Sequence, residues 1–422
     1  MSKPFPSNPP HSHQDLPRQD LRLHLQDQLQ QCRSQTLQLF ADIDAATFCR
    51  QAHPAFSPVG WHLGHIAFTE ALWILEHCAG RTDVIAPADR RLFAADGLPK
   101  AERQNLPDLA GVLDLLAEVR SQVLVYLTQA PLTEQARLWY WLLQHESQHN
   151  ETISFLLQLH RGQPALSSTE NFPAPDYGMV TIPAGTLLRG SDRLDALDNE
   201  QPAQQVEVRE FAIDRYPVTC AQYQAFIESG GYANAAYWSA AGWAWRQAQQ
   251  ITQPLYWPDQ LESQQHHPVY GVSHYEAAAY AHWAGKRLPT ETEWEKAAGW
   301  KAAANTALPY PWGHDAPSLQ YCNHSHQIGQ TTPVNAYPQG QSPSGCWDML
   351  GNVWEWTASY FAGYEGFVAY PYRGYSAEYF DDQHYVMRGG SWVTRPWGLR
   401  SSLRNWYHPW VREIFVGFRC AV

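Results

Sequence analysis

The sequence predicts two different folds in tandem, an all-helical bundle followed by an irregular α+β domain. Residues 21–160 carry apolar residues at helical spacing, interrupted by proline-containing breaks. After residue 177 such long periodic runs stop, and the chain becomes rich in Gly, Pro, Asn, Trp and Tyr. A chain of 422 residues is long enough for two domains, because one hydrophobic core rarely extends beyond about 250–300 residues.

Four long helices are expected in the first domain. They are predicted at residues 21–43, 59–77, 108–129 and 133–160. The second should begin at Ser57-Pro58, with Ser57 as the N-cap and Pro58 as the first helical residue. Four amphipathic helices with a long connection at residues 79–106 are typical of a four-helix bundle.

The ends of the domains follow from composition. Residues 1–20 are rich in Pro, Ser, His and Gln and lack an apolar signal core, which predicts a disordered lead-in. Residues 161–177 are rich in Pro, Ser, Thr and Asn, which predicts a linker. The predicted domains are therefore the bundle at 21–160 and the α+β domain at 178–422.

The second domain should contain short strands and helices with much loop. Strands are expected from Met179 and across 206–213, and helices at 220–228 and 274–283. The chain has 19 Trp and 22 Tyr, and most of its Trp residues follow residue 237. Such amphipathic rings need both packing and hydrogen-bond partners. We expect buried aromatic and polar contacts to hold this domain together.

Charge and composition exclude several functions. The net charge of −12 and the absence of a Lys/Arg run disfavour a nucleic-acid partner and favour a small molecule. The chain has no stretch of about 18 consecutive apolar residues, so neither a transmembrane helix nor a membrane partner is expected. The seven cysteines are scattered and odd in number, without a CxxC pair, which favours reduced thiols in a cytoplasmic protein.

A metal-binding pattern lies in the fourth predicted helix. His145 and His149 are four residues apart, so both imidazoles project from one helix face and can share a metal ion. The apolar neighbours Trp141 and Leu142 argue against two solvated histidines. The same string matches HExxH, the zinc-protease motif, in which Glu146 would be the general base. That class usually has a downstream third ligand, and His160 is poorly placed for the role.

A better third ligand lies upstream, in the string Trp61-His62-Leu63-Gly64-His65 of the second helix. Gly64 permits close approach of two helices, and a bundle can build a metal site from facing helices. Three neutral imidazoles leave open positions on iron, as O2-activating non-haem iron requires. Glu146 or Glu151 is expected to orient a ligand imidazole.

Several strings in the second half are specific to one family. They are DMLGNVWEW at 348–356, RGGSW at 388–392 and GFRC at 417–420. From about residue 178 onward the chain resembles the formylglycine-generating-enzyme domain, a fold related to C-type lectins. Those enzymes use a cysteine pair and copper. The corresponding stretch here, 392–412, contains no cysteine, which argues against that activity.

The two halves together are more specific than either one. A DinB-like four-helix bundle with WHLGH and HExxH, joined to this second domain, resembles the ergothioneine-biosynthetic sulfoxide synthases of the EgtB type, which include the relatives OvoA and SenA. The resemblance implies iron(II) bound by His65, His145 and His149. His62 is then a neighbour of the metal site and not a ligand.

The resemblance also implies a reaction. In that family O2 drives C–S bond formation between hercynine (Nα-trimethylhistidine) and a thiol. The resemblance places Gln148, Asn405 and Trp406 around hercynine, whose quaternary ammonium favours aromatic walls. A tyrosine in the loop after GNVWEW serves as a catalytic residue, and Tyr372 is preferred here over Tyr370 and Tyr375.

The chain departs from the family where the thiol donor binds. Tyr407 stands where enzymes that use γ-glutamylcysteine have an Asp, and the FNSYY string is absent from the long connection. Arg412 and Arg103 are the candidates for a donor carboxylate. The donor therefore stays open between cysteine, γ-glutamylcysteine and a selenosugar, the last of which would make the enzyme a selenoneine synthase.

Two other functions are kept as alternatives. A zinc hydrolase would use HExxH, and a noncatalytic binding protein would use the lectin-like domain without tight metal binding at the three histidines. A structural calcium ion in the second domain is a further expectation. The sequence does not indicate the oligomeric state.

Overall fold

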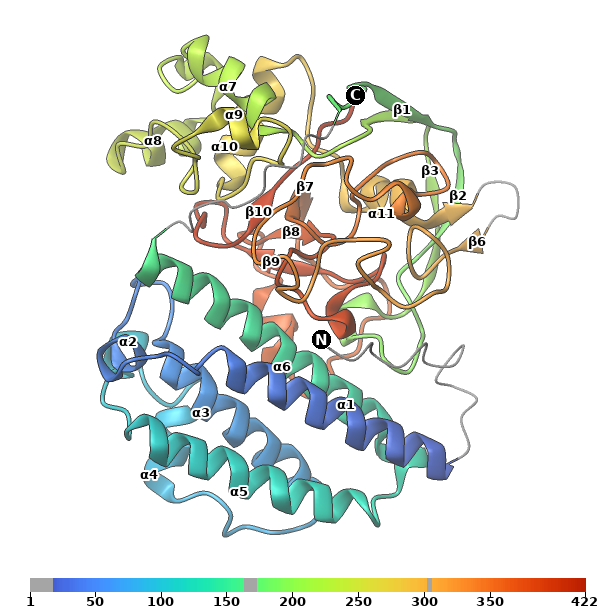
Figure 1. Cartoon of the computed structure of the whole chain (residues 1–422). Helices are drawn as coiled ribbons and strands as arrows, with labels where there is room; N and C mark the ends of the chain where they lie inside the picture. The colour runs from blue at the N-terminus through green and yellow to red at the C-terminus, as the bar shows by residue number, and fades with distance from the viewer. Residues whose placement is uncertain (1–17, 163–172, 302–305) are drawn as a thin grey trace, which may run out of the picture. The chain divides into compact units, whose positions relative to one another are not determined.

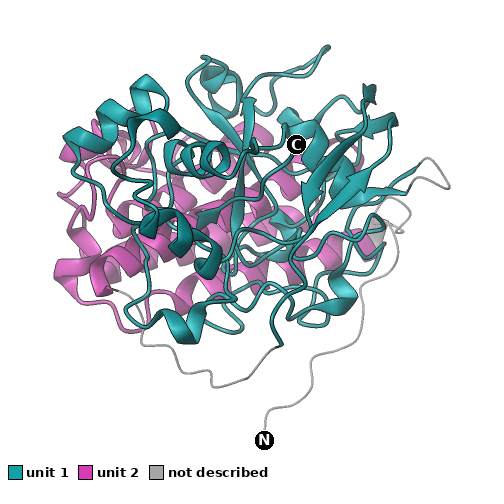
Figure 2. Ribbon diagram, turned by 90° about the horizontal axis from the view of Figure 1, so that it is seen from above, with its two compact units in different colours: residues 1–11, 164–422 teal, residues 12–163 magenta. Residues whose placement is uncertain are grey.

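The computed structural model describes residues 18–162, 173–301 and 306–422. The chain divides into two compact units (Figures 1 and 2), one of residues 12–163 and one of residues 164–422 with 1–11. Most of the predicted lead-in at 1–20 and of the predicted linker at 161–177 lies outside the described residues. In the part of the chain that is described, no helix is long and apolar enough to cross a bilayer.

The first unit is a helix bundle, as predicted. Figure 1 shows its long helices side by side, and these are α1 (Arg18–Gln38), α3 (Val59–Glu70), α5 (Leu109–Leu127) and α6 (Leu132–Arg161). Helix α3 packs against both α5 and α6, while α1 packs mainly against α6. All twelve residues of α3 are buried, so this helix lies inside the unit.

Two details of α3 differ from the prediction. Pro58 occupies the N-cap position, and the Ser57 hydroxyl accepts a hydrogen bond from Arg103 instead of capping the helix. The predicted continuous helix to His77 changes after Glu70 into a π-helix, η2 (Ala71–Cys78). The apolar pattern continues through both segments, so it did not reveal the change in hydrogen bonding. Short π-helical segments are rare and are frequent near functional sites.

The long connection between η2 and α5 is more ordered than predicted. It contains α4 (Pro87–Phe93) and the 3₁₀ turn η3 (Lys100–Glu102), while α2 (Ala45–Cys49) precedes α3. The buried ring of Phe93 lies against Gly64, where any β-carbon would approach it to 2.1 Å. Gly64 thus brings α4 against α3, although the sequence suggested contact between two long helices.

The second unit is an irregular α+β domain around a small sheet (Figure 1), as predicted. Its four-stranded sheet has the order β10-β7-β8-β9, with β10 parallel to β7 and the other pairs antiparallel. The strands of this sheet are β7 (Trp354–Tyr360), β8 (Tyr385–Arg388), β9 (Asn405–Tyr407) and β10 (Val416–Gly417).

The unit also contains three two-stranded sheets, with the pairs β1-β4, β2-β3 and β5-β6. Their strands are β1 (Met179–Ile182), β2 (Gly185–Arg189), β3 (Gln204–Val208), β4 (Phe211–Asp214), β5 (Trp300–Lys301) and β6 (Thr306–Ala307). The helices are α7 (Cys220–Glu228), α8 (Ala240–Ala248), α9 (Leu261–Gln264), α10 (His274–Trp283) and α11 (Glu291–Gly299). Helices α7 and α10 have the predicted bounds, whereas the single strand predicted at 206–213 is divided between β3 and β4.

Aromatic rings and buried ion pairs stabilise this unit. The Trp294 and Trp356 indoles are fully buried, and each donates its N–H, to Glu355 and to the Val272 carbonyl respectively. Buried arginines pair with glutamates from distant segments. These pairs are Arg388–Glu295, Arg400–Glu200, Arg404–Glu291 and Arg419–Glu355. The expected scaffold role of the aromatic and polar side chains is therefore confirmed for these residues.

Candidate metal centre

Helix α6 supplies two of the three predicted ligands. His145 and His149 stand one turn apart on the same face, with ring centroids 4.5 Å apart. Their Nε2 atoms are only 3.2 Å apart. The Trp141 ring lies 5.1 Å from that of His145, so an apolar residue one turn earlier packs beside the first ligand. Two lone pairs that point to one place are suited to sharing a cation.

Helix α3 brings the third imidazole to the same place. The His65 ring centroid lies 5.2 Å from that of His145 and 4.8 Å from that of His149. One nitrogen of each of the three residues lies within 4.8 Å of the others. Of the described residues, these are the only group of three or more potential metal ligands. The trio predicted from the sequence is therefore brought together, and His62 lies outside it.

Burial keeps these imidazoles neutral. His65 and His145 are 7% and 6% exposed. Burial lowers the pKa of His65 to about 4, and it lowers the pKa of both His145 and His149 well below the ordinary value. Neutral imidazoles keep the lone pair that a metal needs. The donor set therefore fits a borderline divalent metal such as iron(II) or zinc(II).

The orientation of His65 is set by its neighbours. Its Nδ1 lies 2.7 Å from the Phe93 carbonyl oxygen, which can only accept, so Nδ1 carries the proton and Nε2 is left with the lone pair. The Trp61 indole stacks on the ring at 4.7 Å and donates its own N–H to the Leu92 carbonyl. Phe93 cannot be identified from the sequence as a partner of His65, since no side-chain pattern reveals a backbone acceptor.

Glu146 points away from the metal centre. Its carboxylate accepts hydrogen bonds from Thr36 at 2.6 Å, from Arg33 at 2.9 Å and from Arg120 at 2.7 Å. Burial raises the pKa of Glu146, but Arg33 and Arg120 outweigh burial and lower it to about 2. A general base needs a free carboxylate near the metal. Of the two carboxylates expected to orient a ligand imidazole, Glu146 is excluded, because its oxygens are used by Thr36 and the two arginines, whereas Glu151 stays a prediction.

Arg103 and Gln148 also lie in the bundle unit. Gln148 is half-buried on α6, three residues after His145 and therefore on an adjacent part of the same helix face. Arg103 is 6% exposed, donates to the Leu98 carbonyl and the Ser57 hydroxyl, and stacks on the Trp61 ring at 4.1 Å. The Arg103 guanidinium thus packs on the Trp61 ring, and the Trp61 ring in turn stacks on the His65 imidazole.

The remaining predicted residues belong to the second unit. Trp406 on β9 stacks on Phe361 at 4.0 Å, and the Asn405 side chain accepts the Trp406 backbone N–H. Arg412 is 6% exposed and pairs with Glu276 at 3.4 Å. Tyr372 is 37% exposed, with its ring 6.4 Å from that of Tyr375. The roles predicted for these residues stay predictions.

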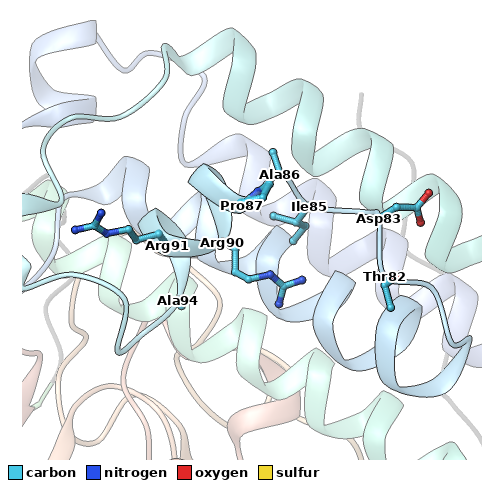
Figure 3. Close-up of a pocket in the computed structure, with 8 residues that line it drawn as sticks. All are labelled: Thr82, Asp83, Ile85, Ala86, Pro87, Arg90, Arg91 and Ala94. Atoms are coloured by element: carbon cyan, nitrogen blue, oxygen red, sulfur yellow. The ribbon is translucent and has the colours of Figure 1, made fainter.

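A pocket of about 540 Å³ lies on the connection that carries Phe93. Figure 3 shows Arg90 and Arg91 of α4 at this pocket, with their guanidiniums pointing away from one another. Arg90 pairs with Glu76 of η2, while Arg91 is exposed. The pocket therefore offers a cationic side chain within the same unit as the metal centre.

Comparison with known proteins agrees with this arrangement. Residues 164–422 match the sulfatase-modifying factor enzyme 1-like domain, and residues 28–153 match the DinB superfamily. The chain is 40% identical over 413 residues to a hercynine oxygenase from Mycobacterium tuberculosis, covering 93% of this chain and 97% of that protein. The chain belongs to the hercynine oxygenase family. As a member of this family it is an enzyme, and its class is oxidoreductase.

A second hercynine oxygenase is similar to this chain over nearly its whole length. The hercynine oxygenase of Mycolicibacterium thermoresistibile is 41% identical over 423 residues, covering 95% of each chain. Among solved structures, PvdO from Pseudomonas aeruginosa is similar to part of this chain. The match covers 58% of this chain and 93% of the PvdO chain, with 26% identity and a TM-score of 0.43. The hercynine oxygenases match over both units, whereas PvdO matches little more than half of the chain.

Proposed function

We propose that this chain is a hercynine oxygenase that holds iron(II) on His65, His145 and His149 and joins a sulfur atom to the imidazole of hercynine. The observation that carries the proposal is the convergence of three imidazoles, two buried and one half-buried, with one nitrogen of each within 4.8 Å of the others. Iron(II) bound there would activate O2 and supply the redox chemistry of C–S bond formation. Three histidines leave up to three positions of an octahedral ion for substrates.

The bundle residues hold the ligands ready for the metal. The Phe93 carbonyl fixes the proton of His65 on Nδ1, and Trp61 restricts the rotation of the ring. Burial of His65 and His145 disfavours their protonated form, which leaves one lone pair on each neutral ring available for the metal. These residues act before any substrate binds, so the centre is preorganised.

A zinc hydrolase is less well supported by the same geometry. That mechanism needs Glu146 to activate water beside the metal. Glu146 instead pairs with Arg33 of α1 and Arg120 of α5. A carboxylate with a pKa of about 2 is also a weak base.

For hercynine we propose contacts with Gln148, Asn405 and Trp406. An aromatic surface suits a trimethylammonium group, and Trp406 has the Tyr379 ring 5.5 Å away as a further aromatic neighbour. Tyr372 is proposed as the tyrosine that transfers a proton, since its hydroxyl belongs to a side chain that is 37% exposed.

For the donor we propose a thiol or selenol whose carboxylate or hydroxyl groups are recognised by arginine. Arg103 and Arg412 already have partners within their own units, so a donor would compete with these contacts. A donor that binds the exposed Arg91, at the pocket of about 540 Å³, would not have to compete with such contacts. Cysteine, γ-glutamylcysteine and a selenosugar all stay candidates.

One experiment tests the function and identifies the donor. The protein is reconstituted with Fe(II) without oxygen, and O2 is added with hercynine and, in separate reactions, cysteine, γ-glutamylcysteine or a selenosugar. Mass spectrometry should detect one adduct of hercynine with a donor. If the protein holds iron but forms no adduct with any donor, the substrates proposed here are wrong.

A further inference from the structure

A fourth imidazole lies against the metal centre and has no role so far. His62 is on α3, three residues before the ligand His65, and is 7% exposed. Its Nδ1 lies 2.9 Å from Nδ1 of His149, and the two ring centroids are 5.1 Å apart. Burying a polar ring is unfavourable unless it is hydrogen-bonded, so this contact needs an explanation.

Metal binding decides the direction of this hydrogen bond. Nε2 of His149 faces Nε2 of His145, so Nε2 is the atom that His149 offers to the metal. A neutral imidazole that binds metal through Nε2 carries its proton on Nδ1. Nδ1 of His149 must therefore donate, and Nδ1 of His62 must accept.

The proton of His62 is then on its other nitrogen. Nε2 of His62 is buried and has no hydrogen-bond partner of normal geometry among the described residues. A doubly protonated His62 would place a second N–H against the N–H of His149, so only the neutral ring can fill this role.

We propose that His62 is the positioning residue of His149, because it accepts the Nδ1–H of His149 and so presents Nε2 of that ring to the metal. Metal-bound histidines commonly donate their second N–H to a carboxylate or carbonyl. His65 follows that rule through Phe93, whereas His149 uses an imidazole. The acceptor carries no charge, so it adds no negative charge to the centre.

This proposal rests on the metal site of the proposed function but not on its substrates. The test can therefore use Co(II) alone as the probe, because its visible spectrum reports both affinity and ligand geometry. His62→Leu and His62→Asn form a matched pair of nearly equal size. The Asn side chain can place an oxygen acceptor where Nδ1 of His62 lies, and the Leu side chain cannot.

We expect His62→Leu to weaken Co(II) binding by roughly 10–100-fold and to change the visible spectrum, as loss of such a partner typically does. His62→Asn should stay close to the wild type in both respects. His77→Leu, in the π-helix that continues α3, is the control for loss of a histidine and should bind Co(II) like the wild type. Thermal melting of the metal-free proteins shows whether folding accounts for any difference.

Nitrogen NMR of the Zn(II)-loaded protein gives a second, independent result. It should show His149 bound through Nε2 with a slowly exchanging proton on Nδ1, and His62→Leu should make that proton exchange faster. Equal Co(II) affinity in His62→Leu and the wild type would overturn the proposal, as would binding of Zn(II) through Nδ1 of His149. A wild-type protein that binds no Co(II) would reject the metal site itself, whereas absence of a hercynine adduct would reject only the substrates.

Discussion

At the scale of single residues, Gly64 decides whether the third ligand is correctly placed. A β-carbon there would lie 2.1 Å from the Phe93 ring, far inside van der Waals contact. Phe93 also provides the carbonyl that holds Nδ1 of His65. Packing through the ring and ligand orientation through the backbone carbonyl therefore depend on the same residue, Phe93, which a methyl group on residue 64 would displace.

We predict that Gly64→Ala destabilises the bundle by about 1–3 kcal/mol, the usual cost of overpacking. It should also weaken metal binding by roughly tenfold, because the partner of His65 moves. Gly178→Ala is a matched control, since a β-carbon at Gly178 meets nothing within 4 Å. Chemical denaturation and Co(II) titration of both variants measure the two effects. Unchanged metal affinity in Gly64→Ala would show that the Phe93 carbonyl does not orient His65.

At the scale of the elements, a buried ionic cluster joins all four long helices of the bundle. Its members are Arg33 of α1, Glu70 of α3, Arg120 of α5 and Glu146 of α6. Each carboxylate contacts both guanidiniums, so the two positive and two negative charges balance. Because Glu70 and Glu146 lie on the helices that carry the ligands, the cluster fixes α3 and α6 with respect to each other.

Removing one charge from this cluster should be costly. Glu146→Gln leaves two buried guanidiniums with one carboxylate, and breaking a buried pair typically costs about 3–5 kcal/mol. Asp83→Asn, which removes the exposed pair with Arg81, should change stability by less than about 1 kcal/mol. Urea unfolding followed by helical circular dichroism measures both. A change in the free energy of unfolding of less than about 1 kcal/mol in Glu146→Gln would contradict the importance of this cluster for stability. Loss of activity in this variant is thus no evidence for a hydrolase.

The elements also show what the sequence can and cannot predict. The four long helices, α7 and α10 were predicted because their apolar spacing and caps are local signals, such as Asp108 accepting the Gly111 N–H. Helix α4 was not predicted, because seven residues are too few for a periodic pattern and its position depends on Gly64 and Phe93. The three ligands were predicted from spacing and resemblance. The roles of His62, Phe93 and Glu146 depend on which way each side chain points, and the sequence does not determine this.

At the scale of the whole molecule, the second unit contains histidines whose burial lowers their pKa. His274 stacks on Tyr385 at 3.7 Å, and its Nε2–H donates to the Thr357 carbonyl. Burial lowers the pKa of His267, His274 and His324 to about 4 each. All three lie far in sequence from the metal ligands and in the other unit.

These pKa values predict that the second unit loses stability in acid. Between pH 6.5 and about 4 the unfolded chain binds protons that the folded chain does not, so the free energy of unfolding falls as the pH falls. For His274 the shift corresponds to roughly 3 kcal/mol in total. The variant His274→Asn keeps a donor for Thr357 and should flatten the dependence of stability on pH in this range. An equal slope in the wild type and the variant would show that His274 does not contribute to acid sensitivity.

The central claim for the whole molecule is that the three-histidine centre binds the iron that this member of the hercynine oxygenase family needs for activity. The most direct measurement is bound iron and O2-dependent consumption of hercynine, determined on the same anaerobically reconstituted samples of wild type, His65→Ala and the control His77→Ala. We predict that His65→Ala loses iron and activity together, while His77→Ala keeps both. Full activity of His65→Ala without bound iron would contradict the account.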